Sequence, residues 1–327
     1  MNALKILIVI GLLTWMVQTG KLSLTQMSVF VTQPLILIVG TIAWLIGPVL
    51  LGTWRWWLLV RGAGLECRFL RALQLQLVGF FFNTAMPGAV GGDIVKAIYI
   101  VRDQNGPSGK TPALLSVVLD RIVGLIGLFT MGASVALLNY QSLVENPSIA
   151  KLVNGLIFVF ALSCLFLILV FIPYKQSKDP FEKILKRSFP GFRMLLGIYL
   201  ALRQYRHDPK RLFLTIGISI CLQIMFMSYM GFVGQVLYPD QFDSSLLPTV
   251  FPFGILVTAI PLAPGGLGVG HAAFERLFSI VGLPGGANVF NIFTLSQLAL
   301  NLLCFIPYLL IRKNEPFNLE QQIATFE

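Results

Sequence analysis

Long apolar runs separated by short polar segments dominate the pattern of this chain. Six runs approach the roughly 20 apolar residues that a membrane-spanning helix requires. They cover residues 3–19, 34–57, 114–139, 152–173, 212–237 and 289–311. None shows the alternation of apolar and polar residues that is typical of strands in an outer-membrane barrel. The pattern therefore predicts an all-α polytopic membrane protein with about six transmembrane helices.

Two further apolar regions, residues 70–101 and 246–281, are interrupted near the middle by proline and glycine. Irregular backbone at membrane depth survives only inside the protein or beside a watery cavity, because lipid offers no hydrogen-bond partners. Each region therefore fits a re-entrant helical hairpin better than a straight span. The two breaks are alike and the hairpins would enter from opposite faces, which suggests an inverted repeat with a substrate site near the midplane.

Basic residues are distributed unevenly among the loops. The chain has 24 Lys and Arg against 14 Asp and Glu, and ten of the basic residues lie in 174–211. With the N-terminus inside, only Lys21 and Lys151 fall in outer loops, so both termini are expected to be cytoplasmic. The segment 174–211 interleaves apolar and basic residues, as in a membrane-surface helix or a solvated connector. We expect one transmembrane domain, residues 1–313, with a short cytoplasmic tail, residues 314–327.

Composition excludes several classes of function. Only 12% of the residues are charged and the mean hydropathy is +0.80, whereas soluble proteins carry roughly 25% charged residues. The basic residues do not form a patch with interspersed aromatic residues on a soluble domain, so nucleic acid is not an expected partner. Hydrolase, zinc-protease and P-loop motifs are missing, and the four cysteines and two histidines form no ligand set. We therefore expect no ATPase, no metal site and no cofactor.

Arginine and tryptophan are concentrated at the end of the second apolar run. The residues concerned are Trp44, Trp54, Arg55, Trp56, Trp57, Arg61, Arg68 and Arg71. The tryptophans are expected to anchor the helix at the membrane interface, and the arginines to hold this end inside.

Ionisable residues follow the first break. Asp93 and Lys96 come after Gly91 and Gly92 and share a helix face because they are three positions apart. A helix start offers unpaired N–H groups and the positive end of the dipole, which favour an anion such as phosphate. In one interpretation these groups and Asn83 bind a lipid headgroup. In the other, Asp93 caps the helix and pairs with a nearby base.

Two adjacent charges, Asp120 and Arg121, follow Thr111 by roughly 14 Å at about 1.5 Å per helical residue, which predicts a position near the bilayer middle. A charge there costs at least about 2.5–3.5 kcal/mol on insertion scales, so each needs a partner. Neighbouring residues point about 100° apart on a helix, so we expect the crossed pairs Asp93–Arg121 and Lys96–Asp120. These pairs are either a static lock between helices or part of a phosphate site that uses the planar guanidinium of Arg121.

The second break carries another pair of titratable side chains. His271 and Glu275 follow Gly265 and Gly266 and lie four positions apart, on one helix face. Histidine titrates near neutral pH, and a buried glutamate can do so as well, so a proton-coupled step is one interpretation. The alternative is a hydrogen-bonded pair that stabilises the hairpin.

Three motifs, FFNTAMPGAVGGDIVKA, SVVLDRIVGLIGL and PLAPGGLGVGHAAFERLF, occur in this order. Together they resemble the flippase-like membrane-domain family typified by the transmembrane domain of lysylphosphatidylglycerol synthase. The resemblance implies a bacterial inner-membrane bundle that moves or handles lipids with anionic or modified headgroups. Family members often carry a glutamate where His271 stands, so either Glu275 supplies the carboxylate or the headgroup differs. The soluble aminoacyl-transferase domain would lie beyond Glu327, so an enzyme is not expected.

The leading hypothesis is transbilayer movement of an anionic or modified-headgroup phospholipid or glycolipid. The expected headgroup residues are Asn83, Gly91, Gly92, Asp93, Lys96, Asp120, Arg121, Gly265, Gly266, His271 and Glu275. One alternative is a non-transporting accessory that presents lipid to a lipid-modifying enzyme through residues 174–211. Another is a secondary transporter of small solutes. The sequence leaves a homo-oligomer open.

Overall fold

A computed structural model describes most of the chain. It covers residues 24–85, 91–104, 110–172, 196–197, 199–200, 202–203, 205–258 and 268–314. Regular structure in these ranges is helical, with no strand among them, so the predicted all-α class is confirmed. The predicted first span, residues 3–19, lies outside the described residues, as do most of 174–211 and the tail.

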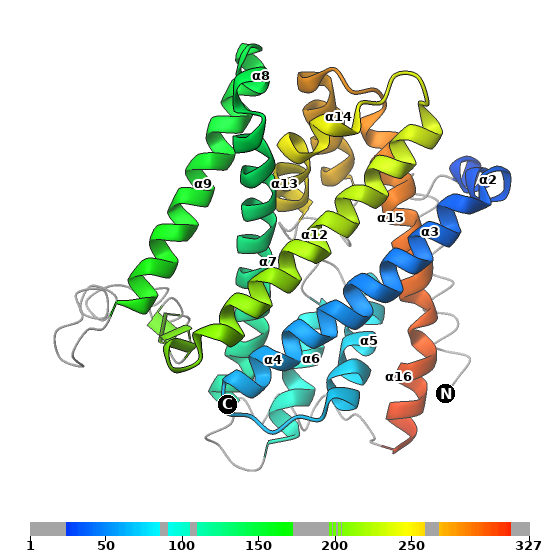
Figure 1. Cartoon of the computed structure of the whole chain (residues 1–327). Coiled ribbons are helices and arrows are strands. Elements are labelled where there is room, and N and C mark those ends of the chain that lie inside the picture. The colour runs from blue at the N-terminus through cyan, green and yellow to red at the C-terminus, as the bar shows by residue number, and fades with distance from the viewer. Residues whose placement is uncertain are drawn as a thin grey trace.

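Five helices are long and apolar enough to cross a membrane, and they correspond to the other five predicted spans (Figure 1). They are Pro34–Gly62, Thr111–Leu138, Pro147–Phe171, Pro209–Leu237 and Gly286–Leu309. The first is built from α3 (Pro34–Trp44), a π-helical turn (Leu45–Leu51) and α4 (Gly52–Gly62). The others are α7 (Lys110–Leu138), α9 (Pro147–Phe171), α12 (Pro209–Leu237), and α15 (Gly286–Leu303) with α16 (Phe305–Asn314). The protein is a polytopic helical membrane protein.

The π-helical turn has a local cause. Pro48 lies inside it and has no N–H, so the regular hydrogen bond to the carbonyl four residues earlier cannot form. The turn widens instead, and at its end the N–H of Gly52 donates to the carbonyl of Gly47. The α-helix resumes as α4, which carries Arg55 and Trp56.

Each interrupted apolar region consists of two helices packed against each other. The first contains α5 (Phe69–Ala85) and α6 (Gly91–Arg102), and the second contains α13 (Leu247–Thr258) and α14 (Val269–Val281). Figure 1 shows the two pairs at opposite ends of the bundle. The intervals between the helices, which hold Gly265 and Gly266, lie outside the described residues. Re-entry of either pair into a bilayer and an inverted repeat both stay predictions.

A single close approach of backbones joins α5 to α6. A Cβ atom on Gly92 would collide with the carbonyl oxygen of Gly79, so the crossing requires glycine at position 92. The side-chain amide oxygen of Asn83 accepts a hydrogen bond from the N–H of Gly92 over 2.8 Å. The start of α6 is thereby fixed against α5, and Asp93 and Lys96 are held in place.

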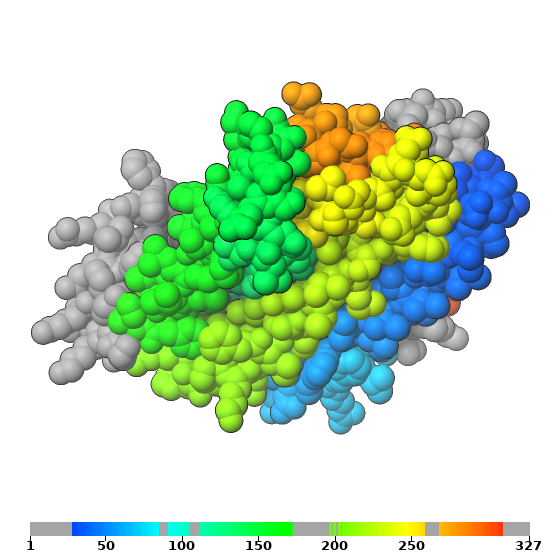
Figure 2. Space-filling model, turned by 45° about the horizontal axis from the view of Figure 1, so that its top comes forward, coloured from blue at the N-terminus to red at the C-terminus, as the bar shows by residue number. Residues whose placement is uncertain are grey.

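The outer surface of the bundle is apolar. Large hydrophobic side chains are exposed along α3, α9 and α12, among them Ile42, Phe158, Leu165 and Ile224. Figure 2 shows one such face, with α12 running against α3 and α9 standing at the edge. Because large apolar surfaces of this kind are rare on soluble monomers, this belt is the surface that faces lipid.

Basic side chains gather at one end of the bundle. Arg61, Arg71, Arg102 and Arg211 lie at the ends of α4, α5, α6 and α12 that point the same way in Figure 1. Arg71 forms a two-bonded ion pair with Asp103, at 2.7 and 2.8 Å. This distribution agrees with the predicted charge asymmetry, while the cytoplasmic assignment of this end stays a prediction.

Candidate functional site

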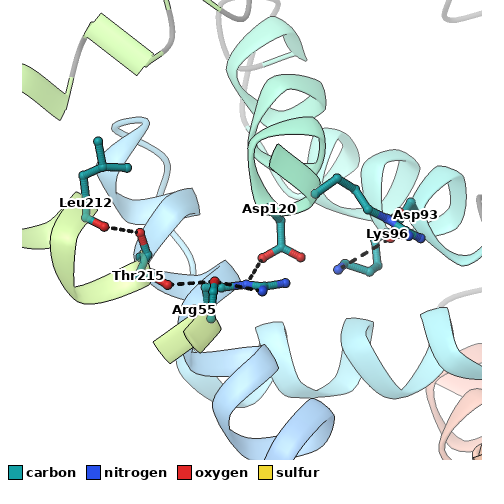
Figure 3. A network of polar contacts seen from close by, with 8 residues as sticks. Arg55, Asp93, Lys96, Asp120, Leu212 and Thr215 are labelled. Carbon is teal, nitrogen blue, oxygen red and sulfur yellow. Dashed lines mark hydrogen bonds and ion pairs between the residues drawn. The ribbon is translucent and has the colours of Figure 1, made fainter. Parts of the chain in front are cut away.

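Arg55 lies at the centre of the candidate site, although the sequence analysis placed it with the basic residues of the inner end. Its side chain is only 13% exposed. The Nε atom donates to Oδ1 of Asp120 over 2.8 Å, and Nη1 donates to Oγ of Ser219 over 3.0 Å (Figure 3). Arg55 therefore joins three helices, α4, α7 and α12, inside the bundle.

The second ion pair, between α7 and α6, agrees with the sequence analysis. Nε of Arg121 donates to Oδ2 of Asp93 over 2.5 Å, as the expected crossed pair requires. The other expected pair, Lys96 with Asp120, is wrong. Asp120 pairs with Arg55 of α4 instead. The prediction used helical periodicity within α6 and α7 alone, so it could not include a partner from a third helix.

Lys96 is buried, with 4% of its side chain exposed. Its ammonium lies 4.3 Å from the ring centroid of Trp56 and 3.9 Å from Oδ1 of Asp93. A cation over an indole face is attracted by the ring quadrupole, and the attraction grows when both are desolvated. Trp56 is 0% exposed and Trp44 is 7% exposed, so the expectation that these two tryptophans anchor the interface is wrong. Trp44 instead donates from Nε1 to Oδ1 of Asn301.

Within the described ranges, five charged groups make up this site, which we call the charged cluster. They are Arg55, Asp93, Lys96, Asp120 and Arg121. Three cations and two anions give these five groups a formal charge of +1 in surroundings where charges interact strongly. The cations are not equally accessible, because the Arg121 side chain is 46% exposed while that of Lys96 is almost fully enclosed. Among the described residues, the cluster thus combines the half-exposed guanidinium of Arg121 with two largely enclosed cations, Arg55 and Lys96.

A chain of hydrogen bonds extends the cluster into α12. Oγ of Ser219, which accepts from Arg55, donates to the carbonyl of Thr215 over 2.9 Å. Oγ1 of Thr215 donates to the carbonyl of Leu212 over 2.7 Å (Figure 3). These contacts fix the Arg55 guanidinium against the helix, so its position does not depend on the ion pair alone.

The predicted residues of the first break that carry no charge have structural contacts. Asn83 caps the start of α6 through Gly92, and Gly91 and Gly92 are both buried. They lie directly beside Asp93 and therefore belong to the same site. Whether they also contact a headgroup stays a prediction.

The second break is built differently. Nδ1 of His271 accepts a hydrogen bond from the N–H of Gly268 over 3.1 Å, and Nε2 lies 3.0 Å from Oδ1 of Asn291. Because Nδ1 is an acceptor here, these contacts favour the neutral ring with its proton on Nε2. Oε2 of Glu275 accepts from the N–H of Ala287 at the start of α15, over 2.8 Å.

The structure therefore divides the predicted site residues into two groups. Within the described ranges, no hydrogen bond or ion pair joins His271 or Glu275 to the charged cluster, nor the two to each other. Gly265 and Gly266 lie outside those ranges, so the predicted meeting of the two hairpin tips is also outside them. No group of three or more His, Cys, Asp or Glu side chains in the described part of the chain could hold a metal ion.

Arg55, Trp56 and Ser219 are the site residues that sequence reasoning missed. The burial of Arg55 could have been predicted from the length of the second apolar helix, which continues to Gly62. Arg55 then lies about 10 Å inside the helix end at 1.5 Å per residue, too deep for an interface residue.

Comparison with known proteins agrees with this picture. The family described as lysylphosphatidylglycerol synthase TM region matches residues 2–307. The UPF0104 membrane protein PH1989 of Pyrococcus horikoshii is 26% identical over 259 residues, which cover 72% of this chain and 74% of that protein. No solved structure matches.

Proposed function

Because the chain belongs to the lysylphosphatidylglycerol synthase transmembrane-region family, we propose that it moves an anionic lipid headgroup across the bilayer by way of the charged cluster. The family indicates a membrane role related to lipids, and the movement of a headgroup is the step that we add. The bacterial inner membrane, with both chain termini on the cytoplasmic side, is the proposed location. A membrane phospholipid or glycolipid is the proposed substrate.

The formal charge of +1 on the charged cluster is the observation that supports this proposal. A lipid phosphodiester carries one negative charge and would bring the total to zero. A neutral total matters in the bilayer, because an uncompensated charge there is costly. A static lock between helices would need only two matched pairs, whereas these five groups include a third cation, Lys96, which shares Asp93 with Arg121.

Arg121 is the residue at which we propose that the phosphate first binds. Its half-exposed guanidinium can form two parallel hydrogen bonds to phosphate oxygens. Asp93 would release part of its contact with Arg121 as the phosphate arrives. Lys96 and Arg55, held behind by Trp56 and Ser219, attract the anion without leaving their places. The acyl tails stay in lipid along the apolar belt.

Lipid translocation in proteoliposomes tests the proposal. Fluorescent phosphatidylglycerol is placed in both leaflets, and its quenching from outside reports the rate at which inner-leaflet lipid is exposed. Arg121→Ala is expected to lower the rate by roughly 10- to 100-fold, the effect of losing hydrogen bonds to a charged group. Lys151→Ala, which removes an exposed cation at the start of α9, is the matched control and should leave the rate unchanged.

Two results would contradict the proposal. One is an Arg121→Ala rate equal to that of the wild type in vesicles with equal protein content. The other is a wild-type rate equal to that of empty vesicles, which would favour the accessory function or a small-solute transporter. Solute flux measured in the same vesicles separates those two alternatives.

A further inference from the structure

Three buried polar atoms close to the charged cluster in sequence have no hydrogen-bond partner within the described part of the chain. They are Oγ1 of Thr53, Nε1 of Trp56 and Oε1 of Gln76. Thr53 and Trp56 are 0% exposed and Gln76 is 8% exposed. Buried polar atoms are almost always paired, because an unpaired one forfeits its hydration and gains nothing in return. Three such atoms in one region indicate a polar group that the protein binds there.

The three side chains come from α4 and α5, two helices that pack against each other. Thr53 and Trp56 are one turn apart on α4, so they point to the same side. Gly52, next to Thr53, faces Gln76: a Cβ atom on Gly52 would lie 3.6 Å from Nε2 of Gln76. One turn beyond Gln76 on α5, Gly79 lies against the side chain of Lys96. We call this interface the polar subsite.

The polar subsite adjoins the charged cluster through Trp56. One face of the indole lies 4.3 Å from the Lys96 ammonium, while the ring N–H of the same side chain is unpaired. Arg55, the residue before Trp56, is part of the cluster. A ligand with a phosphate on the cluster would therefore place the next atoms of its headgroup at Thr53, Trp56 and Gln76.

The unpaired atoms specify the chemistry of that headgroup. Trp56 offers a donor, Gln76 offers an acceptor, and the Thr53 hydroxyl can be either. A hydroxyl group is also both donor and acceptor, so two or three hydroxyls can satisfy all three atoms. An ammonium can only donate, which leaves the Trp56 N–H unpaired, and it would be repelled by Lys96 and Arg55 nearby.

We propose that the polar subsite binds the hydroxyl groups of a polyol-phosphate headgroup, such as glycerol phosphate or a sugar phosphate, whose phosphate lies on the charged cluster. This inference rests on the proposed function, because it takes the charged cluster as the phosphate site. The protein then selects hydroxyl-rich anionic lipids over amine-bearing ones, and the selection comes from Thr53, Trp56 and Gln76 rather than from the charges.

The test compares two ligands of equal charge on the full purified chain in detergent. Dioctanoyl phosphatidylglycerol and dioctanoyl phosphatidylpropanol carry the same phosphodiester and the same number of head carbons, but the second has no head hydroxyls. Wild-type protein is expected to bind the glycerol lipid roughly tenfold more tightly, since a lost hydrogen bond at a buried site costs about one to two factors of ten.

Variants then assign the preference to the subsite. Trp56→Phe keeps a six-membered aromatic ring near Lys96 and removes the pyrrole ring with its N–H, and Gln76→Met removes the acceptor at similar volume. Each should reduce the preference to about twofold or less, and Gln76→Met should leave binding of the propanol lipid unchanged. Ser244→Ala removes another buried, unpaired hydroxyl on a different element and should leave the preference intact.

The outcomes separate this inference from the proposed function. If wild type binds both lipids equally and Arg121→Ala weakens both, the polar subsite is overturned and the phosphate site stands. If wild type binds neither lipid, the charged cluster is not a phosphate site and both proposals fail. If soluble glycerol 3-phosphate binds as tightly as the lipid, the subsite stands and the proposed lipid substrate is replaced by a small solute.

Discussion

The two broken helix pairs begin from similar sequence and use it in different ways. Both have proline and a glycine pair followed by a helix with ionisable residues, as 87–96 and 264–275 show. In the first pair the charged side chains reach other helices, since Asp93 bonds Arg121 of α7. In the second, the partners carry no charge: His271 contacts the N–H of Gly268 and Oδ1 of Asn291, and Glu275 accepts from the N–H of Ala287.

The difference teaches that a glycine break sets where a helix begins but not what its side chains do. At the first pair, α4, α7 and α12 supply Arg55, Asp120 and Ser219 to the charged cluster. At the second, the neighbours are the aromatic rings of Phe274 and Phe290, which stack with centroids 4.9 Å apart. A charged partner is therefore present at one break and missing from the described surroundings of the other.

The largest effect should come from breaking the charged cluster. Asp120→Ala leaves the guanidinium of Arg55 buried with only Ser219 as a partner, and removes a negative charge near Lys96. Loss of one member of a buried ion pair costs about 3–5 kcal/mol. We expect Asp120→Ala to lower the thermal midpoint in detergent by many degrees and to reduce the yield of monodisperse protein. A midpoint within a degree of the wild type would show that the cluster is hydrated rather than buried.

A smaller effect is expected at the second pair. Glu275→Ala removes a carboxylate that accepts from Ala287 at the positive end of α15. Because Glu275 is exposed, the loss should be about 1 kcal/mol, in the range of a helix cap. The same thermal measurement, made beside Asp120→Ala, checks the order of the two effects. An equal or larger loss for Glu275→Ala would reverse the comparison.

The smallest expected effect concerns a thiol just before the start of α5, in the first pair. Burial, and next the negative charge of Asp103, raise the pKa of Cys67 from 9.0 to about 11. The thiolate is the reactive form, so maleimide labelling of Cys67 should be slow at pH 8 and rise about tenfold per pH unit until near pH 11. Between pH 9 and 11 the unfolded chain has lost this proton while the folded chain keeps it, so this group lowers stability as the pH rises through that window.

Cys67 labelling also sharpens the comparison of the two pairs. Substitutions that loosen the first pair should lower the pKa of Cys67 toward 9.0 and speed labelling at pH 8. Substitutions in the second pair, such as Glu275→Ala, should not change it. Labelling of Cys67→Ser protein supplies the background from the other cysteines. Equal acceleration by both kinds of substitution would mean that the two pairs do not open independently.

Much of the fold could be predicted from the sequence. The five described spans, the two interrupted regions and the Asp93–Arg121 pair all follow from apolar run length, glycine and proline placement, and the cost of an unpaired charge in lipid. These are properties of one helix or of its immediate surroundings. The site was predicted only in part, since Arg55 was assigned to the inner end and Trp56 to the interface.

By itself, then, the sequence determined that this chain is a helical membrane protein with two breaks and a set of buried charges in need of partners. Only the tertiary structure decided which partners they have. The sequence contains several arginine and lysine residues that could pair with Asp120. Which of them does so depends on which helix packs against Asp120. That helix is α4, which follows the π-helical turn at Pro48 and whose Arg55 guanidinium lies against Gly124 of α7. Side-chain chemistry is local, whereas pairing depends on helices that the chain brings together from far apart.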